Sequence, residues 1–340
     1  MSEASGIPIR DRLRLRPYRP GDEERILASY NQIFTVPRSL AHWHWKFRDN
    51  PVGEYQISVA EDTETGDVVG HYAGIPLATW MEGVRAKSAQ IVDLVVLPAW
   101  RRHGGRPGLF AQVGRFWIDS YIDEQRGQNV FAFGWPVPAW RAGQKYLSYL
   151  NVRDWDLLFR ETGAGFEPRA APAALAVEPV ARFGPDVDAL WQRMQGELKL
   201  AVVRDARYLN WRYADHPDVR YTLLECREVG SGALRGIAVY GAGDWPRPNT
   251  GCIVDWLAPA ADADVMQALL AACEREAARG GVDVLTTIFN HVDPRFLQFQ
   301  RAGFLVLGTS YFVVIKTTPR LDTVYYRDHW YLTPGDSDLV

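Results

Sequence analysis

Cysteine is scarce in this sequence, and no stretch of it is strongly apolar. The 340 residues contain three cysteines, Cys226, Cys252 and Cys273, all in the second half. Their odd number and their spacing exclude a disulfide framework and match no zinc motif, so we expect free thiols and no metal. No apolar run approaches the roughly 18 residues that span a bilayer, and the N-terminal MSEASGIPIRDRLRLRP has no apolar signal core. We therefore expect a soluble, cytoplasmic protein with no membrane partner.

The charge is nearly balanced. Lys and Arg total 38 against 41 Asp and Glu, for a net charge of −3. A nucleic-acid-binding domain normally carries a basic face, so we expect no nucleic-acid partner. The composition, 47% hydrophobic with 13 tryptophans, is that of a globular protein large enough for two domains.

The two halves of the chain resemble each other. Four segments of the first half recur in the same order in the second, which indicates a duplication with copies of domain size. The pairs are Leu13–Ile26 with Leu175–Leu190, WKFRDNP (Trp45–Pro51) with WRYADHP (Trp211–Pro217), IVDLVVLP (Ile91–Pro98) with IVDWLAP (Ile253–Pro259), and Phe131–Leu150 with Leu285–Leu305.

Each copy repeats one pattern of elements: a short strand, a helix, three alternating strands, a long helix, a strand, a short helix and a final strand. We predict an α/β (α+β) fold with two tandem domains, each a mixed, mainly antiparallel sheet flanked by helices. The expected extents are 1–165 and 175–320, with a Gly/Pro/Ala linker over 162–174. A tail follows over 321–340, and its end, PGDSDLV, is expected to be frayed.

The segment PAWRRHGGRPG, Pro98–Gly108, follows the predicted strand QIVDLVVL and precedes the predicted helix Leu109–Tyr121. A helix N-terminus presents unpaired N–H groups, glycines let the backbone wrap an anion, and arginines add charge. The spacing fits neither the Rossmann fingerprint nor the P-loop. The sequence therefore predicts an anion site of another kind.

This segment resembles the acyl-CoA pyrophosphate loop of the GNAT N-acetyltransferase superfamily. In VVLPAWRRHGGRPGLF, Pro98, Trp100, Arg101 and Gly104 match the pattern, whereas Arg106 stands where the family usually has Gly or Ala. The two-copy arrangement is similar to mycothiol synthase and the Eis-type acetyltransferases. The resemblance implies acetyl-CoA or another acyl-CoA as co-substrate, held by Val95, Val96, Leu97, Arg101, Arg102, His103, Gly104, Gly105, Arg106, Pro107 and Gly108.

The matching segment of the second copy, APAADADVM, has no glycine or arginine but carries Asp262 and Asp264. Negative charge at that place would repel a pyrophosphate, so we expect a single CoA site, in the first copy.

The resemblance also implies catalytic groups beside the strand that ends at Leu97. Asp93 is the nearest carboxylate and a candidate base if its pKa is raised; because Asp255 matches it in the second copy, a structural role explains it equally well. The usual Tyr position of the family holds Gln144, so Tyr146 and Tyr149 are the candidate general acids.

These expectations combine into one function. The chain is expected to transfer an acetyl or other short acyl group from CoA to a primary amine of a small molecule, as a monomer or homodimer. Two alternatives stay open: an aminoacyl-tRNA-dependent transferase of the tandem GNAT-like type, and an acyl-CoA-binding protein without catalysis.

Overall fold

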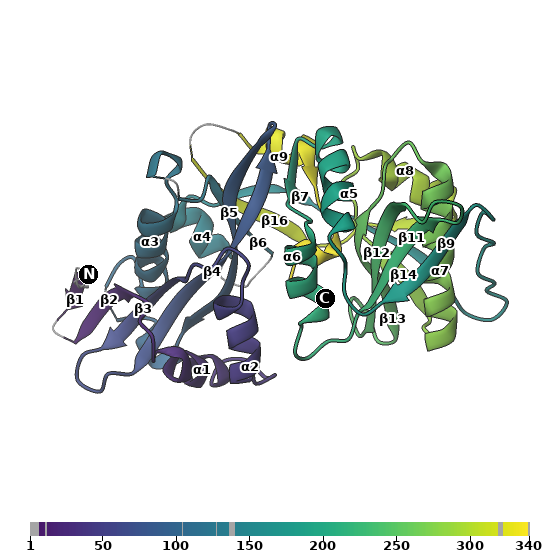
Figure 1. Ribbon diagram of the computed structural model, residues 1–340. Coiled ribbons are helices and arrows are strands. Elements are labelled where there is room, and N and C mark those ends of the chain that lie inside the picture. Colours follow the sequence, from purple (N-terminus) through teal and green to yellow (C-terminus); the bar gives the residue numbers. More distant parts are fainter. Residues whose placement is uncertain are drawn as a thin grey trace. The chain divides into compact units, whose positions relative to one another are not determined.

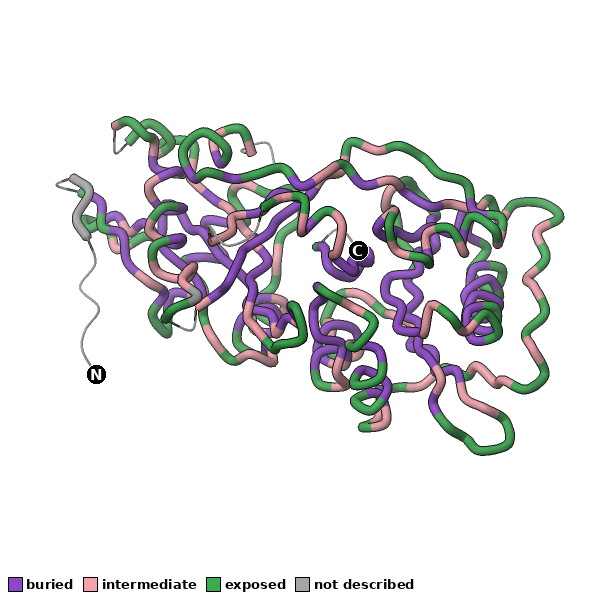
Figure 2. The backbone as a smooth tube through the Cα atoms, turned by 90° about the horizontal axis from the view of Figure 1, so that it is seen from above, coloured by how far each residue is buried: buried purple, intermediate pink, exposed green. Residues whose placement is uncertain are grey.

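The computed structural model describes residues 7–10 (backbone only), 12–103, 105–126, 128–135, 140–318 and 322–338. The chain forms two compact units (Figure 1). The first unit contains residues 1–78, 86–153 and 312–323, and the second contains 79–85, 154–311 and 324–340. In each unit the buried residues gather along the strands, while loops and outer helix faces are exposed (Figure 2).

The first unit contains one mainly antiparallel sheet with the strand order β1-β2-β3-β4-β5-β6-β16-β7. Its strands are β1 (Ile7–Arg10), β2 (Leu13–Pro17), β3 (Gln56–Asp62), β4 (Val68–Met81), β5 (Val84–Val96), β6 (Phe131–Gly134), β7 (Leu150–Asp154) and β16 (Phe312–Thr317). Its helices are α1 (Glu23–Asn31), α2 (Leu40–Trp43), which continues as the π-helical segment His44–Arg48, α3 (Leu109–Tyr121) and α4 (Trp140–Leu147).

Helices cover both faces of this sheet. On β4, Tyr72 packs against Trp117 of α3, with ring centroids 5.5 Å apart, and the next residue, His71, faces Ser29 of α1. Neighbouring strand residues point to opposite faces, so α3 lies on one side and α1 on the other.

The second unit repeats this plan in a sheet of order β15-β8-β14-β13-β12-β11-β9. Its strands are β8 (Leu157–Glu161), β9 (Leu175–Val180), β11 (Thr222–Glu228), β12 (Leu234–Gly243), β13 (Thr250–Leu257), β14 (Val284–Thr287) and β15 (Leu305–Leu307). Its helices are α5 (Asp186–Met194), α6 (Ala206–Leu209), which also continues as a π-helical segment, α7 (Ala263–Gly280), α8 (Pro294–Arg301) and α9 (Thr323–His329). The short strand β10 (Leu200–Val202) pairs with β17 (Trp330–Tyr331) and with Thr79–Met81 at the end of β4.

The predicted fold class and the predicted strands and helices are confirmed, including α3 at its expected bounds. Two strands, however, do not lie in the sheet that sequence order would give them. The strand β8 lies within the expected first domain yet pairs with β14 and β15 of the second unit, and β16, near the end of the expected second domain, pairs with β6 of the first. The compact units are therefore not the contiguous ranges 1–165 and 175–320.

The expectation of a frayed chain end is wrong for Pro334–Ser337. These residues are buried in the second unit, and Asp336 accepts a 2.6 Å hydrogen bond from the buried Arg204. The buried ion pair with Arg204 holds this segment in place. The expectation failed because the polar sequence of the segment does not show that Asp336 has a buried partner. None of the helices in the described part of the chain combines the length and apolar character needed to cross a bilayer.

The contact between β4 and α3 gives a test of the packing. A Cβ on Gly74 would overlap the Trp117 ring, which is fully buried and donates a 2.7 Å hydrogen bond from Nε1 to the Gln56 carbonyl oxygen. Gly74→Ala should therefore lower the free energy of unfolding by about 1–3 kcal/mol in urea titrations. Gly196→Ala, where a Cβ would meet open space, is the control and should leave stability nearly unchanged.

Candidate functional site

The loop between β5 and α3 is shaped as the sequence predicts. After β5, Pro98–Trp100 form one 3₁₀ turn, and Gly108 occupies the N-cap position of α3. A Cβ at Gly108 would lie 3.0 Å from the Arg101 carbonyl oxygen, and Gly105 has φ +81°, so both positions favour glycine. Gly104, which we also predicted to bind the cofactor, lies outside the described residues.

Backbone N–H groups at this loop face no acceptor in the described residues. Gly105, Arg106, Gly108, Leu109 and Phe110 make no hydrogen bond through their N–H to the described part of the chain. Pro107 has no N–H, but its carbonyl oxygen accepts a 2.7 Å bond from Gln112 Nε2, which holds the loop against α3. The start of α3 is therefore a donor-rich end carrying roughly half a positive charge, suited to an anion.

The basic side chains of the loop are exposed. Arg101, Arg102, His103 and Arg106 all extend into solvent, and Arg101 Nε reaches back to the Val96 carbonyl oxygen at 3.4 Å. Because Arg106 is exposed, it does not fill the loop where the family pattern usually has a small residue. The structure thus brings these four predicted side chains to one loop.

The strand β5 is distorted just before this loop. Asp93 has φ +53°, a left-handed conformation that is rare for a residue other than glycine and typical of a bulge. The strand pairs in parallel with β6 from Ser88–Phe131 to Gln90–Phe133, although β5 itself continues to Val96. Val95 and Val96, predicted to face the cofactor, lie directly after the distortion, whereas Leu97 donates its N–H to the Val69 carbonyl oxygen at 2.9 Å.

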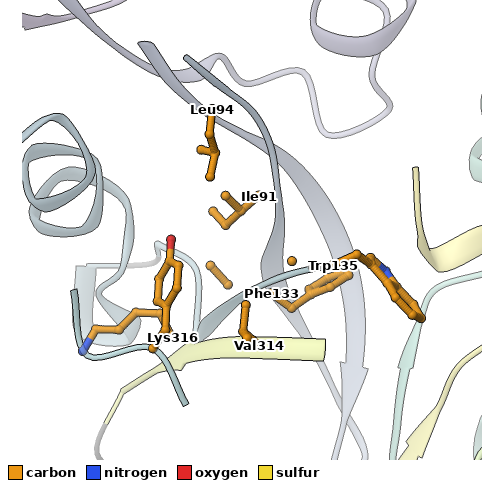
Figure 3. A pocket seen from close by; sticks show the side chains of 9 residues that line it. Ile91, Leu94, Phe133, Trp135, Val314 and Lys316 are labelled. Carbon is orange, nitrogen blue, oxygen red and sulfur yellow. The ribbon is translucent and has the colours of Figure 1, made fainter. Parts of the chain in front are cut away.

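A small cavity of about 20 Å³ lies where β5 and β6 separate (Figure 3). Ile91 and Leu94 of β5, Ala132 to Trp135 of β6 and the loop after it, Tyr149, and Val314 and Lys316 of β16 line it. The lining is apolar apart from the Tyr149 hydroxyl and the ammonium end of Lys316, which Figure 3 shows pointing away from the cavity.

Tyr149 is buried at this cavity. Its ring packs so closely on α4 that a Cβ on Gly143 would overlap it, and its hydroxyl has no hydrogen-bond partner in the described residues. Burial raises the pKa of the phenol well above its ordinary value, so the group stays protonated at neutral pH. Tyr146, the other candidate acid, is 37% exposed, and Lys145 Nζ lies 5.1 Å from its ring centroid.

Asp93 does not have the raised pKa that the sequence analysis required of a base. It is buried, forms an ion pair with Arg38, and accepts a 3.2 Å hydrogen bond from Lys46 Nζ. Burial raises the pKa of Asp93, but the charges of Lys46 and Arg38 outweigh burial and hold that pKa well below the usual carboxyl range. A carboxylate that stays ionised between two cations is a poor proton acceptor.

The same ion pair occurs in the second unit. Arg204 and Asp255 are both buried, and Arg204 Nε donates to Asp255 Oδ1 at 2.8 Å. Each arginine lies just before its short helix, α2 or α6. Each aspartate lies at an irregularity of its central strand. In β13 this irregularity is Val254, which is skipped in the pairing with β12. In this unit Tyr213 Oη donates to Asp255 Oδ2 at 2.7 Å. In each unit, therefore, the aspartate of the repeated IVD segment pairs with an arginine that lies outside the four repeated segments.

The loop of the second unit differs from that of the first. Asp262 caps α7 by accepting a 3.1 Å bond from the Val265 N–H, and it also pairs with Arg235 at 2.7 Å. A carboxylate already bound to the helix N-terminus takes the donors that an anion would need. We therefore still expect no second anion site at α7.

On the α1 face of the first unit lie a buried histidine and a groove. Burial lowers the pKa of His71 to about 4, against the opposing effect of Asp93, so the imidazole is neutral at pH 7. Next to it a groove of about 560 Å³ reaches the loop through Leu97 and Trp100. Its rim carries the exposed carboxylates Glu24 and Asp67.

Comparison with known proteins agrees with this geometry. Residues 14–137 match the family model described as the acetyltransferase (GNAT) domain. Among solved structures, a probable N-acyltransferase from Enterococcus faecalis V583 superposes with a TM-score of 0.66 at 14% identity, covering 90% of this chain and 72% of that one. A GCN5-related N-acetyltransferase from Anabaena variabilis gives 0.66 at 14%, covering 90% and 73%.

N-myristoyltransferase from Saccharomyces cerevisiae with bound myristoyl-CoA gives a TM-score of 0.58 at 12% identity, covering 92% of this chain and 84% of that one. Identities this low show a shared fold. Comparison with curated protein sequences finds no match.

The buried charges around Asp93 give a prediction. Asp93→Asn would remove the buried carboxylate that pairs with Arg38 and Lys46, and we expect a loss of about 3–5 kcal/mol in the free energy of unfolding at pH 7. Because the folded-state pKa of Asp93 lies below its unfolded value, its stabilisation is present at neutral pH and lost as the pH falls below about 4.

Urea unfolding at several pH values measures both effects. Asp49→Asn, in the exposed pair with Arg48, is the matched control and should cost less than about 1 kcal/mol. Equal stabilities of the Asp93 variant and wild type at pH 7 would contradict the assignment.

Proposed function

We propose, on the premise that residues 14–137 form a domain of the GNAT family, that the protein transfers a short acyl group from acyl-CoA to the amine of a small molecule. The observation that carries the proposal is the alignment of three features along β5 and α3. These are the left-handed distortion at Asp93, the cavity where β5 leaves β6, and the donor-rich start of α3.

The loop would bind the pyrophosphate of the co-substrate. The N–H groups from Gly105 to Phe110 supply donors, and Arg101 and Arg106 supply charge. The thioester would then lie beside β5 at Val95 and Val96, where a backbone N–H that points away from β4 would stabilise negative charge on the carbonyl oxygen.

In the reaction the amine nitrogen attacks the thioester carbon, and the carbon–sulfur bond breaks. Tyr149, protonated and buried at the cavity, gives its proton to the departing thiolate and regains one from solvent. The proton of the amine leaves to water, since Asp93 is held by two cations and His71 has a pKa of about 4.

Calorimetric titration with acetyl-CoA tests the binding step. The wild type should bind, and the Arg101→Ala, Arg106→Ala variant should bind at least about tenfold more weakly, because two charge-assisted contacts to phosphate are lost. The Arg207→Ala, Arg301→Ala variant removes the same charge from exposed sites of the second unit and should bind normally. If the wild type does not bind, the CoA proposal fails.

Thiol release across a panel of primary amines tests the chemistry. Tyr149→Phe should lower kcat by about 10²-fold with little change in KM, because only the departing thiolate needs the proton. Tyr146→Phe tests the other candidate acid, and full activity of this variant would leave Tyr149 as the proton donor.

The two remaining outcomes are also informative. Equal kcat in wild type and the Tyr149 variant would remove Tyr149 from the mechanism. Binding of acetyl-CoA without thiol release from any amine would favour an acyl-CoA-binding protein.

A further inference from the structure

One wall of the cavity comes from the far end of the sequence. The strand β16, Phe312–Thr317, lies between β6 and β7 and pairs antiparallel with β6, with Val314 opposite Gly134 and Lys316 opposite Ala132. Val314 and Lys316 line the cavity, together with Ile91 and Leu94 of β5. The first unit thus needs a strand from beyond residue 311 to close its own cavity.

The cavity is small and lined mainly by apolar side chains. Its volume of about 20 Å³ is near the minimum that holds one water molecule, and therefore also suits one methyl group. Val314 is 6% exposed and Phe133 is 1% exposed, so neither can turn outward without leaving a void. Figure 3 shows Val314 and Phe133 on the side of the cavity opposite Leu94.

Lys316 contributes its aliphatic stem to the wall, because its ammonium group points away. Burial lowers the pKa of Lys316, and Arg115 adds to this effect while Asp119 opposes it. The charged end therefore does not enter the cavity, and the only residue of β16 that limits the depth of the cavity is Val314.

We propose that Val314 limits the length of the acyl group, so that the protein uses acetyl-CoA and excludes longer acyl chains. This inference rests on the proposed function and adds the chemical class of the acyl donor. A longer chain would have to displace Val314 from a packed sheet, whereas the methyl group of acetyl fits the space present. One methylene in such a pocket changes kcat/KM by about tenfold or more.

The test compares acetyl-, butyryl- and octanoyl-CoA in wild type, Val314→Ala and Val313→Ala. Val313 is fully buried on the same strand but points to the opposite face, so its variant loses the same two methyl groups away from the cavity. We expect the wild type to prefer acetyl over butyryl, and Val314→Ala to raise the butyryl-to-acetyl ratio of kcat/KM at least about tenfold. Val313→Ala should leave that ratio unchanged.

Two results would overturn the inference while the proposed function stands. One is octanoyl transfer by the wild type at the acetyl rate, and the other is an unchanged ratio in the Val314 variant with normal acetyl transfer. If no thiol is released, the ratio of the dissociation constants for the same three thioesters, measured by calorimetry, gives the same test. If the wild type binds none of them, the proposed function and this inference both fail.

Discussion

In each unit an arginine pairs with a buried aspartate at an irregular point of the central strand. In the first unit Arg38 joins Asp93, and in the second Arg204 joins Asp255. Two buried charges are stable only when they stay together, so each pair fixes a short helix against its central strand. At Asp93 the backbone is left-handed, and the residues that follow it, Val95 and Val96, are the ones expected to face the thioester. The same pairing in both units agrees with a structural role for these aspartates.

The difference between the copies lies in the loop that follows this strand. In the first unit, the backbone N–H groups at the start of α3 have no acceptor among the described residues, and exposed arginines precede them. In the second, Asp262 caps α7 and pairs with Arg235. The two units thus share a similar arrangement of strands and helices but differ in the charge at the start of α3 and of α7. The second half still supplies β16, whose Val314 closes the cavity of the first unit.

The sequence predicts many of the strands and helices, because local residue patterns are enough to identify them. Alternating residues identify β3, β4 and β5, and the glycines and Pro107 locate the start of α3. The exchange of β8 and β16 was not predictable, since an apolar strand pattern states that a strand is buried but not beside which neighbour. The pKa of Asp93 was likewise out of reach, because Arg38 and Lys46 are distant in sequence and meet it only in the folded chain. The buried Pro334–Ser337 segment depends on Arg204 in the same way.

The central claim is that acyl-CoA binds along β5 and the start of α3 in the first unit alone. Amide hydrogen exchange with and without acetyl-CoA measures this directly, because a bound ligand protects the N–H groups that it contacts. The account predicts slower exchange at residues 94–96 and 105–110, and no change at residues 258–265 of the second unit. Unchanged exchange at 105–110, or protection at 258–265, would contradict it.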